Sequence, residues 1–247
     1  MRSAIVTGAT SGIGRAAALA LADDGWWVLA AGRDPGRGEE VASLLGERGE
    51  FAAGDLEDLA TADRLVERAA VDGRRLGLVV NNAAVHFLGT LDQLPDDAFE
   101  RLMLVNVNAA VALARAGVRA MSADGEGGVI INVSSEAGLY AIPNQIAYNV
   151  SKAALIMLTR SIAVDHAASG IRAVSICPGT TLTPLVERAI ASADDPAAHE
   201  TKLASSRPMR RLGRSEEIAD AIVFAAGDKA SFITGTELIV DGGFTAV

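Results

Sequence analysis

The stretch TGATSGIG at residues 7–14 places three glycines between a short apolar run and a segment of helical period. In a turn from a strand into a helix, Gly8 would allow the tight bend, Gly12 would let the backbone approach a pyrophosphate, and Gly14 would permit close packing of the helix on the sheet. The amide groups that begin the helix would then face the anion. The stretch therefore predicts a dinucleotide site. We place three further residues of the turn at this site: Thr10, Ser11 and Ile13.

Short apolar runs alternate with longer segments of helical period along the rest of the chain. Examples are WVLAAG before EEVASLLGERG, and GVIINVS before the segment that holds Tyr148. Strands that are apolar throughout and are separated by helices indicate a parallel sheet covered on both faces. With FAAGD at residues 51–55 as the third strand, the pattern predicts an α/β, Rossmann-type doubly wound sheet of seven parallel strands with helices on both faces.

The domain organisation is simple, because no linker, repeat or low-complexity segment divides the chain. We expect one catalytic domain over residues 1–247. The least regular part lies at residues 180–214, after a strand end of the kind at which open α/β sheets bind ligands. These residues are expected to form a cover over the substrate, with an ordinary surface insertion as the alternative.

The charge balance is acidic, with 22 Lys and Arg against 31 Asp and Glu and a net charge of −9. Such a field repels polyanions and argues against nucleic acid or an anionic membrane as a partner. No secretory leader is evident, and no apolar stretch approaches the roughly 18 residues of a membrane span. The single Cys177 and three scattered histidines give no disulfide and no metal-ligand spacing. We expect a soluble, cytoplasmic protein without a metal.

The stretch AYNVSKAAL at residues 147–155 holds a tyrosine four positions before a lysine. On a helix, Tyr148 and Lys152 would lie one above the other on the same face and could share one space. For an isolated pair of this kind, an ordinary contact on the helix surface is the usual explanation. The remaining motifs decide between these two interpretations.

Together with the glycine turn, this pair makes the chain resemble the single-domain branch of the short-chain dehydrogenase/reductase family over essentially its whole length. The other matching motifs are NNAA at 81–84, LVNVNAA around Asn106, NVSS at 132–135, and Pro178-Gly179 followed by Thr183. One departure is Ala84, where the family usually has glycine. The resemblance implies a nicotinamide-dependent oxidoreductase, either NADP- or NAD-dependent, that acts on a small-molecule secondary alcohol or ketone.

The chemistry of that reaction gives Tyr148 and Lys152 their expected roles. A tyrosine with its ordinary pKa of about 10 is a poor base near neutral pH. A lysine ammonium one turn away favours the phenolate, as does the positive ring of an oxidised nicotinamide, and a decrease of about 3 pKa units corresponds to about 4 kcal/mol. We expect Tyr148 to be the general acid/base and Lys152 to tune it; by resemblance, Lys152 also binds the cofactor ribose.

Two further catalytic residues follow from the resemblance. Ser135 lies 13 residues before Tyr148 (148 − 135), the family's usual separation, and its hydroxyl can stabilise charge on the substrate oxygen. Ser134 is the competing candidate. Asn106 resembles the asparagine that holds a water linking Lys152 to solvent, with a helix residue bonded to backbone as the alternative. Tyr140 has no lysine four positions later and is assigned to the substrate loop or to packing.

The resemblance also extends the cofactor site along the strand ends. It implies that Asp55 contacts adenine. The other implied cofactor-binding residues, besides Tyr148 and Lys152, are Leu56, Asn82, Ala83, Pro178, Gly179, Thr181 and Thr183. Candidates for the substrate pocket are His86, Glu136, Gln145 and the segment from Thr183 to Arg211. The polar Gln145 and Glu136 favour a small hydroxylated substrate.

The choice between the two cofactors is expected at the end of the second strand, in LAAGRD. Gly32 occupies the position at which NAD-preferring relatives carry an aspartate, and Arg33 can bind a 2′-phosphate through charge-assisted hydrogen bonds. Asp34 either pairs with Arg33 or faces the ribose. We predict a preference for NADP(H), with Arg33 as its source.

Two functions other than an oxidoreductase are compatible with a dinucleotide-binding fold. A non-catalytic dinucleotide-binding regulator would keep the fold and lose the chemistry, but it has no need of the full Asn106, Ser135, Tyr148 and Lys152 set. An epimerase or dehydratase of the same fold usually has a longer chain.

The apolar helices expected around residues 98–120 and 147–168 need cover, so we predict a homotetramer, as the resemblance also implies.

Overall fold

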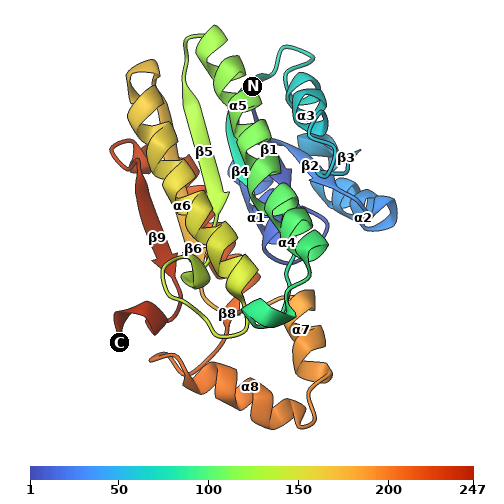
Figure 1. Cartoon of the computed structure of the whole chain (residues 1–247). Coiled ribbons are helices and arrows are strands. Elements are labelled where there is room, and N and C mark those ends of the chain that lie inside the picture. The colour runs from blue at the N-terminus through green and yellow to red at the C-terminus, as the bar shows by residue number, and fades with distance from the viewer.

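Seven parallel strands form the central sheet of the computed structural model, which describes residues 1–247 (Figure 1). Their order is β3-β2-β1-β4-β5-β6-β9. The strands are β1 (Arg2–Thr7), β2 (Trp27–Gly32), β3 (Gly49–Ala53), β4 (Arg75–Asn81), β5 (Gly128–Val133), β6 (Ile171–Pro178) and β9 (Thr236–Val240). Helices cover both faces, so the predicted doubly wound fold is confirmed.

The chain reverses its winding direction between β1 and β4. It first proceeds outward from β1 through β2 to β3, and then returns to pair β4 with the other edge of β1. The connections after these strands therefore diverge at their carboxyl ends, which is where open α/β sheets bind ligands.

The two faces of the sheet pack against different helices because successive strand residues point to opposite sides. Ala4 and Val6 of β1 belong to one apolar core, and Ile5 belongs to the other. The first core is closed by α1 (Gly12–Asp23), α2 (Pro35–Leu45) and α9 (Ser215–Ala226). The second is closed by α3 (Thr61–Ala69), α5 (Ala109–Ala123) and α6 (Ile146–His166).

One continuous helical run contains a π-helical turn and meets the length and composition of a membrane span, and neither feature was expected from the sequence. The residues from Asp96 to Ala123 consist of α4 (Asp96–Met103), a π-helical turn (Leu104–Asn108) and α5. The run is long and apolar enough to cross a membrane by length and composition, contrary to our expectation for the chain. Its apolar window is 56% buried inside the protein, and α5 packs on the sheet, as expected for a core helix.

The segment expected to be irregular contains two helices, α7 (Pro184–Ala191) and α8 (Pro196–Ser205). Each begins with a proline after a residue whose side chain accepts a backbone hydrogen bond, Thr183 and Asp195 respectively. Two short strands, β7 (Thr181–Leu182) and β8 (Gly213–Arg214), pair at its base. Figure 1 shows α7 and α8 projecting beyond the carboxyl ends of the sheet.

Candidate active site

A cleft of about 800 Å³ opens at the reversal point of the sheet. It runs from the glycine turn after β1 to the ends of β2, β3 and β4, and α7 forms part of its wall. Eleven of the predicted cofactor residues line it: Gly8, Thr10, Ser11, Gly12, Ile13, Arg33, Asp55, Leu56, Asn82, Ala83 and Thr183. The structure thus brings together residues that are up to about 175 positions apart in the sequence (183 − 8).

The glycine turn has the geometry that its spacing indicated. Gly8 and Gly12 have φ angles of +65° and +52°, in the left-handed region that favours glycine. Gly14 does not line the cleft but lies beneath the turn, where an added Cβ would come within 2.3 Å of the carbonyl oxygen of Gly8. The start of α1 is therefore packed directly on the turn, with its amide groups toward the cleft.

Six predicted cofactor residues do not line this cleft: Gly14, Tyr148, Lys152, Pro178, Gly179 and Thr181. Pro178 and Thr181 are buried, and the hydroxyl of Thr181 donates to the carbonyl oxygen of Gly179. Gly179 lines a separate cavity of about 130 Å³. Of the residues after β6, only Thr183 and the start of α7 reach the cleft.

The cleft also contains two arginines that sequence reasoning missed. Arg37 of α2 pairs with Asp34 at 2.7 Å, and Asp34 accepts the backbone N–H of Arg37 as the cap of α2. The hydrogen bonds from Arg37 lower the pKa of Asp34. Arg33 makes no ion pair, which resolves the ambiguity over the partner of Asp34. Arg188, one turn into α7, lines the opposite part of the cleft without an ionic partner.

The expected catalytic residues converge beside this cleft. Tyr148, near the start of α6, lies next to Ser135, which directly follows β5. Lys152 is buried one turn later, and its Nζ donates to the carbonyl oxygen of Val133 at 2.8 Å. The Nζ atom lies 5.4 Å from the centre of the Tyr148 ring. Tyr148 is half-buried beside the buried Lys152, so the pair is not an ordinary surface contact.

We expected the pKa of Tyr148 to be lowered, but the protein's own groups raise it. Burial raises the pKa of Tyr148 to about 12, although the nearby Ser135 hydroxyl opposes this shift. Burial likewise lowers the pKa of Lys152 to about 8, because the low-polarity interior disfavours the ammonium ion. Desolvation of both groups therefore affects their pKa values more than the expected attraction between the Lys152 ammonium and the Tyr148 phenolate.

Ser135 and Ser134 differ clearly in their surroundings. The Ser134 hydroxyl is buried and donates to the carbonyl oxygen of Lys152 at 2.7 Å. The Ser135 hydroxyl accepts a hydrogen bond from the backbone N–H of Ala137 and lies next to Tyr148. The geometry therefore favours Ser135 as the residue that works with Tyr148.

Asn106 lies in the π-helical turn between α4 and α5, a feature that often occurs at functional sites. Its Oδ1 accepts from the N–H of Val85 at 2.7 Å, and its Nδ2 donates to the carbonyl oxygen of Val85 and to Ser151. The side chain thus fixes the strand end after β4 against the helix of Tyr148. The second lone pair on Oδ1 is free to accept a further donor.

The expected substrate-pocket residues fall into two groups. His86 packs edge-on against Tyr148, with ring centres 4.6 Å apart, and its Nε2 lies 3.1 Å from Oε1 of Gln145. Burial lowers the pKa of His86. Glu136, in contrast, is turned into a buried ion pair with Arg207 and is not available to a substrate. Tyr140 is exposed and packs against Phe244.

Comparisons with known proteins agree with this geometry. A family model described as enoyl-(acyl carrier protein) reductase matches residues 8–245. An uncharacterized oxidoreductase of Thermotoga maritima is 42% identical over 98% of this chain and 97% of its own length. The cis-4-hydroxycyclohexanecarboxylate dehydrogenase of Sinomonas cyclohexanicum is 39% identical over 100% of this chain and 97% of its own. A solved short chain dehydrogenase/reductase family protein, 36% identical, superposes with a TM-score of 0.90 over 99% of this chain and 97% of its own.

Proposed function

The chain belongs to the short-chain dehydrogenase/reductase family, and from this premise we propose that it is an NAD(P)-dependent oxidoreductase that interconverts a secondary alcohol and a ketone. The observation that carries the proposal is the placement of Tyr148 next to Ser135, with Lys152 buried behind them, beside a cleft that begins at a glycine turn. A binding protein without chemistry has no need of this arrangement.

The cleft has the donors that a dinucleotide requires. The turn from Gly8 to Gly14 presents backbone amides to a pyrophosphate, and Arg188 adds a positive charge from α7. Asp55 and Leu56 would lie along the adenosine part, and Lys152 would reach the nicotinamide ribose. When bound, the cofactor supplies or accepts the hydride; the remaining chemistry belongs to the chain's own side chains.

In the reduction direction, Tyr148 would donate its phenolic proton to the substrate oxygen as negative charge develops there. The Ser135 hydroxyl would donate a hydrogen bond to the same oxygen and so stabilise that charge. Oxidation requires the reverse, in which Tyr148 removes the hydroxyl proton. Burial raises the pKa of Tyr148 to about 12 and so disfavours the phenolate. We propose that the cationic ring of the oxidised cofactor and Lys152 together stabilise the phenolate during oxidation.

The proton would be resupplied through Lys152 and Asn106. Lys152 has a pKa lowered to about 8, so it exchanges protons with water more readily than an ordinary lysine. We propose that the free lone pair of Asn106 holds a water on the route from Lys152 to solvent. Near Tyr148, His86 and Gln145 provide a polar contact that suits a small hydroxylated substrate.

A turnover assay tests the function against the alternative of a non-catalytic regulator. Purified protein would be mixed with NADPH or NADH and a panel of ketones, and with NADP or NAD and the matching secondary alcohols. We expect turnover of at least one pair above the rate without protein. Tight cofactor binding with no turnover across the panel would favour the regulator.

We further propose that the protein prefers NADP(H), because Arg33 lines the cleft and makes no ion pair. At Gly32, an added Cβ would come within 2.6 Å of Cγ2 of Thr10, so an aspartate that binds the ribose hydroxyls has no room there. Arg37 lines the same end of the cleft, although Asp34 neutralises it.

Arg33→Ala should therefore weaken NADPH binding by about tenfold, since a hydrogen bond to a charged group contributes roughly 1.5–3 kcal/mol. The affinity for NADH should stay within about twofold, because NADH lacks the 2′-phosphate. Fluorescence titration of both cofactors against both proteins would measure this, and NADH acts as the internal control. Tighter NADH than NADPH binding by the wild type would remove the basis of the assignment.

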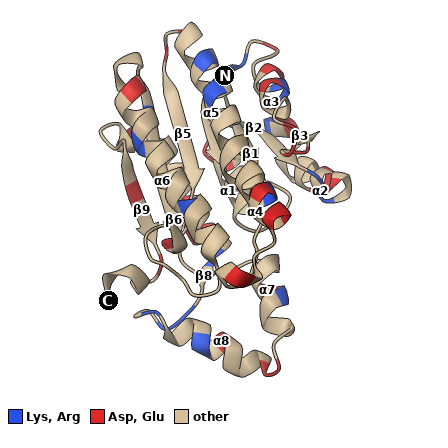
Figure 2. Cartoon of the chain, in the orientation of Figure 1, with Lys and Arg blue, Asp and Glu red and all other residues tan.

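We also propose a homotetramer. Val150, Met157 and Val164 recur at every seventh position of α6 and are exposed, as is Val111 of α5. Figure 1 shows α5 and α6 side by side, and Figure 2 shows that much of this face carries no charged residues. Light scattering at micromolar concentration should give four times the chain mass of 25.4 kDa. A monomer mass would contradict the proposal.

A further inference from the structure

A buried ion pair joins the turn that carries Ser135 to the segment that follows α8. The side chains of Glu136 and Arg207 are 4% and 3% exposed, and Nη2 of Arg207 lies 2.5 Å from Oε1 of Glu136. Glu136 comes directly after Ser135 in the sequence, and its carbonyl oxygen accepts the N–H groups of Leu139 and Tyr140. The pair therefore ties this turn to the segment that follows α8.

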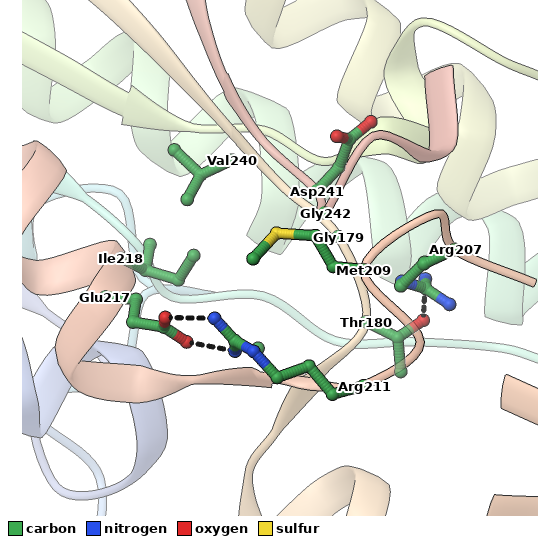
Figure 3. Close-up of a pocket in the computed structure, with 11 residues that line it drawn as sticks. Gly179, Thr180, Arg207, Met209, Arg211, Glu217, Ile218, Val240, Asp241 and Gly242 are labelled. Atoms are coloured by element: carbon green, nitrogen blue, oxygen red, sulfur yellow. Dashed lines mark hydrogen bonds and ion pairs between the residues drawn. The ribbon is translucent and has the colours of Figure 1, made fainter. Parts of the chain in front are cut away.

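Arg207 also gathers several other parts of the chain. Its Nη1 donates to the carbonyl oxygen of Leu203, in α8, at 2.7 Å and to the hydroxyl of Ser206. Its Nη2 also donates to the hydroxyl of Thr180 after β6, as Figure 3 shows at the wall of the 130 Å³ cavity. Its guanidinium lies 5.3 Å from the centre of the Phe244 ring. One side chain thus ties the end of α8 to the strand ends and to the C-terminal turn.

Little apolar packing holds the α7–α8 segment, by which we mean residues 184–205. No residue of α8 is buried, and Ile190 is the only buried residue of α7. Both helices project from the body of the protein (Figure 1). The position of the segment therefore depends on its polar attachments at each end, and Arg207 is the attachment next to α8.

We propose that the Glu136–Arg207 pair is a clasp that positions the α7–α8 segment over the substrate side of the site, and that Glu136 is a positioning residue for Ser135 and Tyr148. This inference rests on the proposed function, because the segment can control substrate binding only if a substrate reacts at Tyr148. It adds to that function by explaining why a charged pair is buried beside the reacting groups.

The two partners depend on each other for their burial. An arginine cannot lose its charge in a protein, so removal of Glu136 leaves a buried cation without its counter-ion. Oε2 of Glu136 and Nε of Arg207 have no hydrogen-bond partner in the structure. Burial raises the pKa of Glu136 to about 7; Arg207 opposes this increase, and Asp241 adds to it. The other hydrogen bonds of Arg207, to Leu203, Ser206 and Thr180, are to neutral groups and do not replace the counter-ion.

The clasp is also coupled to Tyr148 through its charge. The carboxylate of Glu136 raises the pKa of the Tyr148 phenol, because two negative charges repel each other. Loss of this carboxylate should therefore lower the pKa of Tyr148. A residue that only supports the fold would not have this effect on the pH dependence of the reaction.

The test compares Glu136→Gln and Arg207→Met with Arg210→Met, a control at an exposed arginine whose guanidinium bonds only the carbonyl oxygen of Ser205. We expect the substrate KM of both clasp variants to rise at least about tenfold, as a displaced binding element commonly causes. NADPH affinity should fall by less than about tenfold, because Arg188 of the displaced segment is only one of the groups that line the cofactor cleft. Limited proteolysis should cut residues 184–205 faster than in the wild type, and the acid limb of kcat/KM for oxidation should move to lower pH in Glu136→Gln.

A double variant protects the test against misfolding. Glu136→Gln/Arg207→Met leaves no single buried charge and should fold, yet the clasp is absent, so the raised KM and the faster proteolysis should persist. Wild-type KM and protease resistance in the double variant would overturn the proposal. If the wild type itself turned over no substrate, the proposed function would fail, and the proteolysis of the same variants would still decide whether the pair holds the segment.

Discussion

Replacement of Tyr148 by phenylalanine should lower turnover by at least about 100-fold, the usual contribution of a positioned acid or base. Phenylalanine keeps the ring that packs against His86, so the fold and the pocket shape should survive. It removes the phenolic hydroxyl, which lies next to Ser135. The NADPH affinity should change by less than about twofold, because Tyr148 does not line the cofactor cleft in this structure. Steady-state kinetics and a binding titration on the same preparation would measure both.

The second tyrosine of the chain provides a matched control. Tyr140 is 57% exposed and packs against Phe244, and no lysine follows it at the next helical turn. Tyr140→Phe makes the same chemical change outside the reacting group and should keep at least about half of the wild-type turnover. Wild-type-like activity of Tyr148→Phe with a good substrate would show that the proton transfer runs through another group.

The desolvation of Tyr148 distinguishes the two directions of the proposed reaction. With a pKa of about 12, the phenol keeps its proton at neutral pH and is ready to donate it to a ketone. For alcohol oxidation the same group must first lose its proton. That step depends on the positive charges of the oxidised nicotinamide and of Lys152, so the protein alone favours the acid form.

The sequence was sufficient for the sheet and for the glycine turn, because both depend on local patterns. The apolar runs with helical segments between them specify parallel strands, and the order of the strands follows from short right-handed connections. The spacing of Gly8, Gly12 and Gly14 specifies where the backbone must bend and where it must approach another segment. The resemblance to a known family then supplied the expected roles of the residues in the other motifs.

Contacts between distant segments could not be derived in the same way. Arg188 reaches the cleft only because α7 is placed against the glycine turn, where the side chain of Thr183 lies next to Gly12. The Glu136–Arg207 pair joins residues 71 positions apart, and nothing in either local sequence indicates it. The proline after Thr183 and after Asp195, however, is a helix-start signal from which α7 and α8 could have been predicted.

The pKa values also required the structure. From sequence, Tyr148 and Lys152 appear as two groups one turn apart, and only the attraction of nearby positive charges for the phenolate can be considered. Their burial shifts both pKa values in the direction that disfavours the charged forms. Burial depends on how α6 packs on the sheet, and this packing is a property of the whole fold.

Gly14→Ala should weaken the binding of both NADPH and NADH by about 10- to 100-fold and reduce the free energy of unfolding by about 1–3 kcal/mol, the range for overpacking of a close contact. The added Cβ would lie 2.3 Å from the carbonyl oxygen of Gly8 and 2.4 Å from Nδ2 of Asn82. The first of these is backbone, and Asn82 is held by its hydrogen bond to the carbonyl oxygen of Thr7. The methyl group can be accommodated only if α1 moves away from the turn, and this movement displaces the amides that face the pyrophosphate.

Gly36→Ala is the control for this substitution. Gly36 lies in the first turn of α2, near the same end of the cleft, and its added Cβ would meet only Oδ1 of Asp34, at 3.6 Å. Alanine is favoured over glycine in a helix by roughly 0.5–1 kcal/mol, so this variant should unfold at an equal or higher denaturant concentration. Neither Gly14 nor Gly36 has a positive φ, so the comparison isolates the steric contact from backbone strain. Denaturant unfolding and cofactor titration would measure both effects. Equal cofactor affinity and equal stability of Gly14→Ala and Gly36→Ala would mean that close packing of α1 on the turn does not determine the cofactor site.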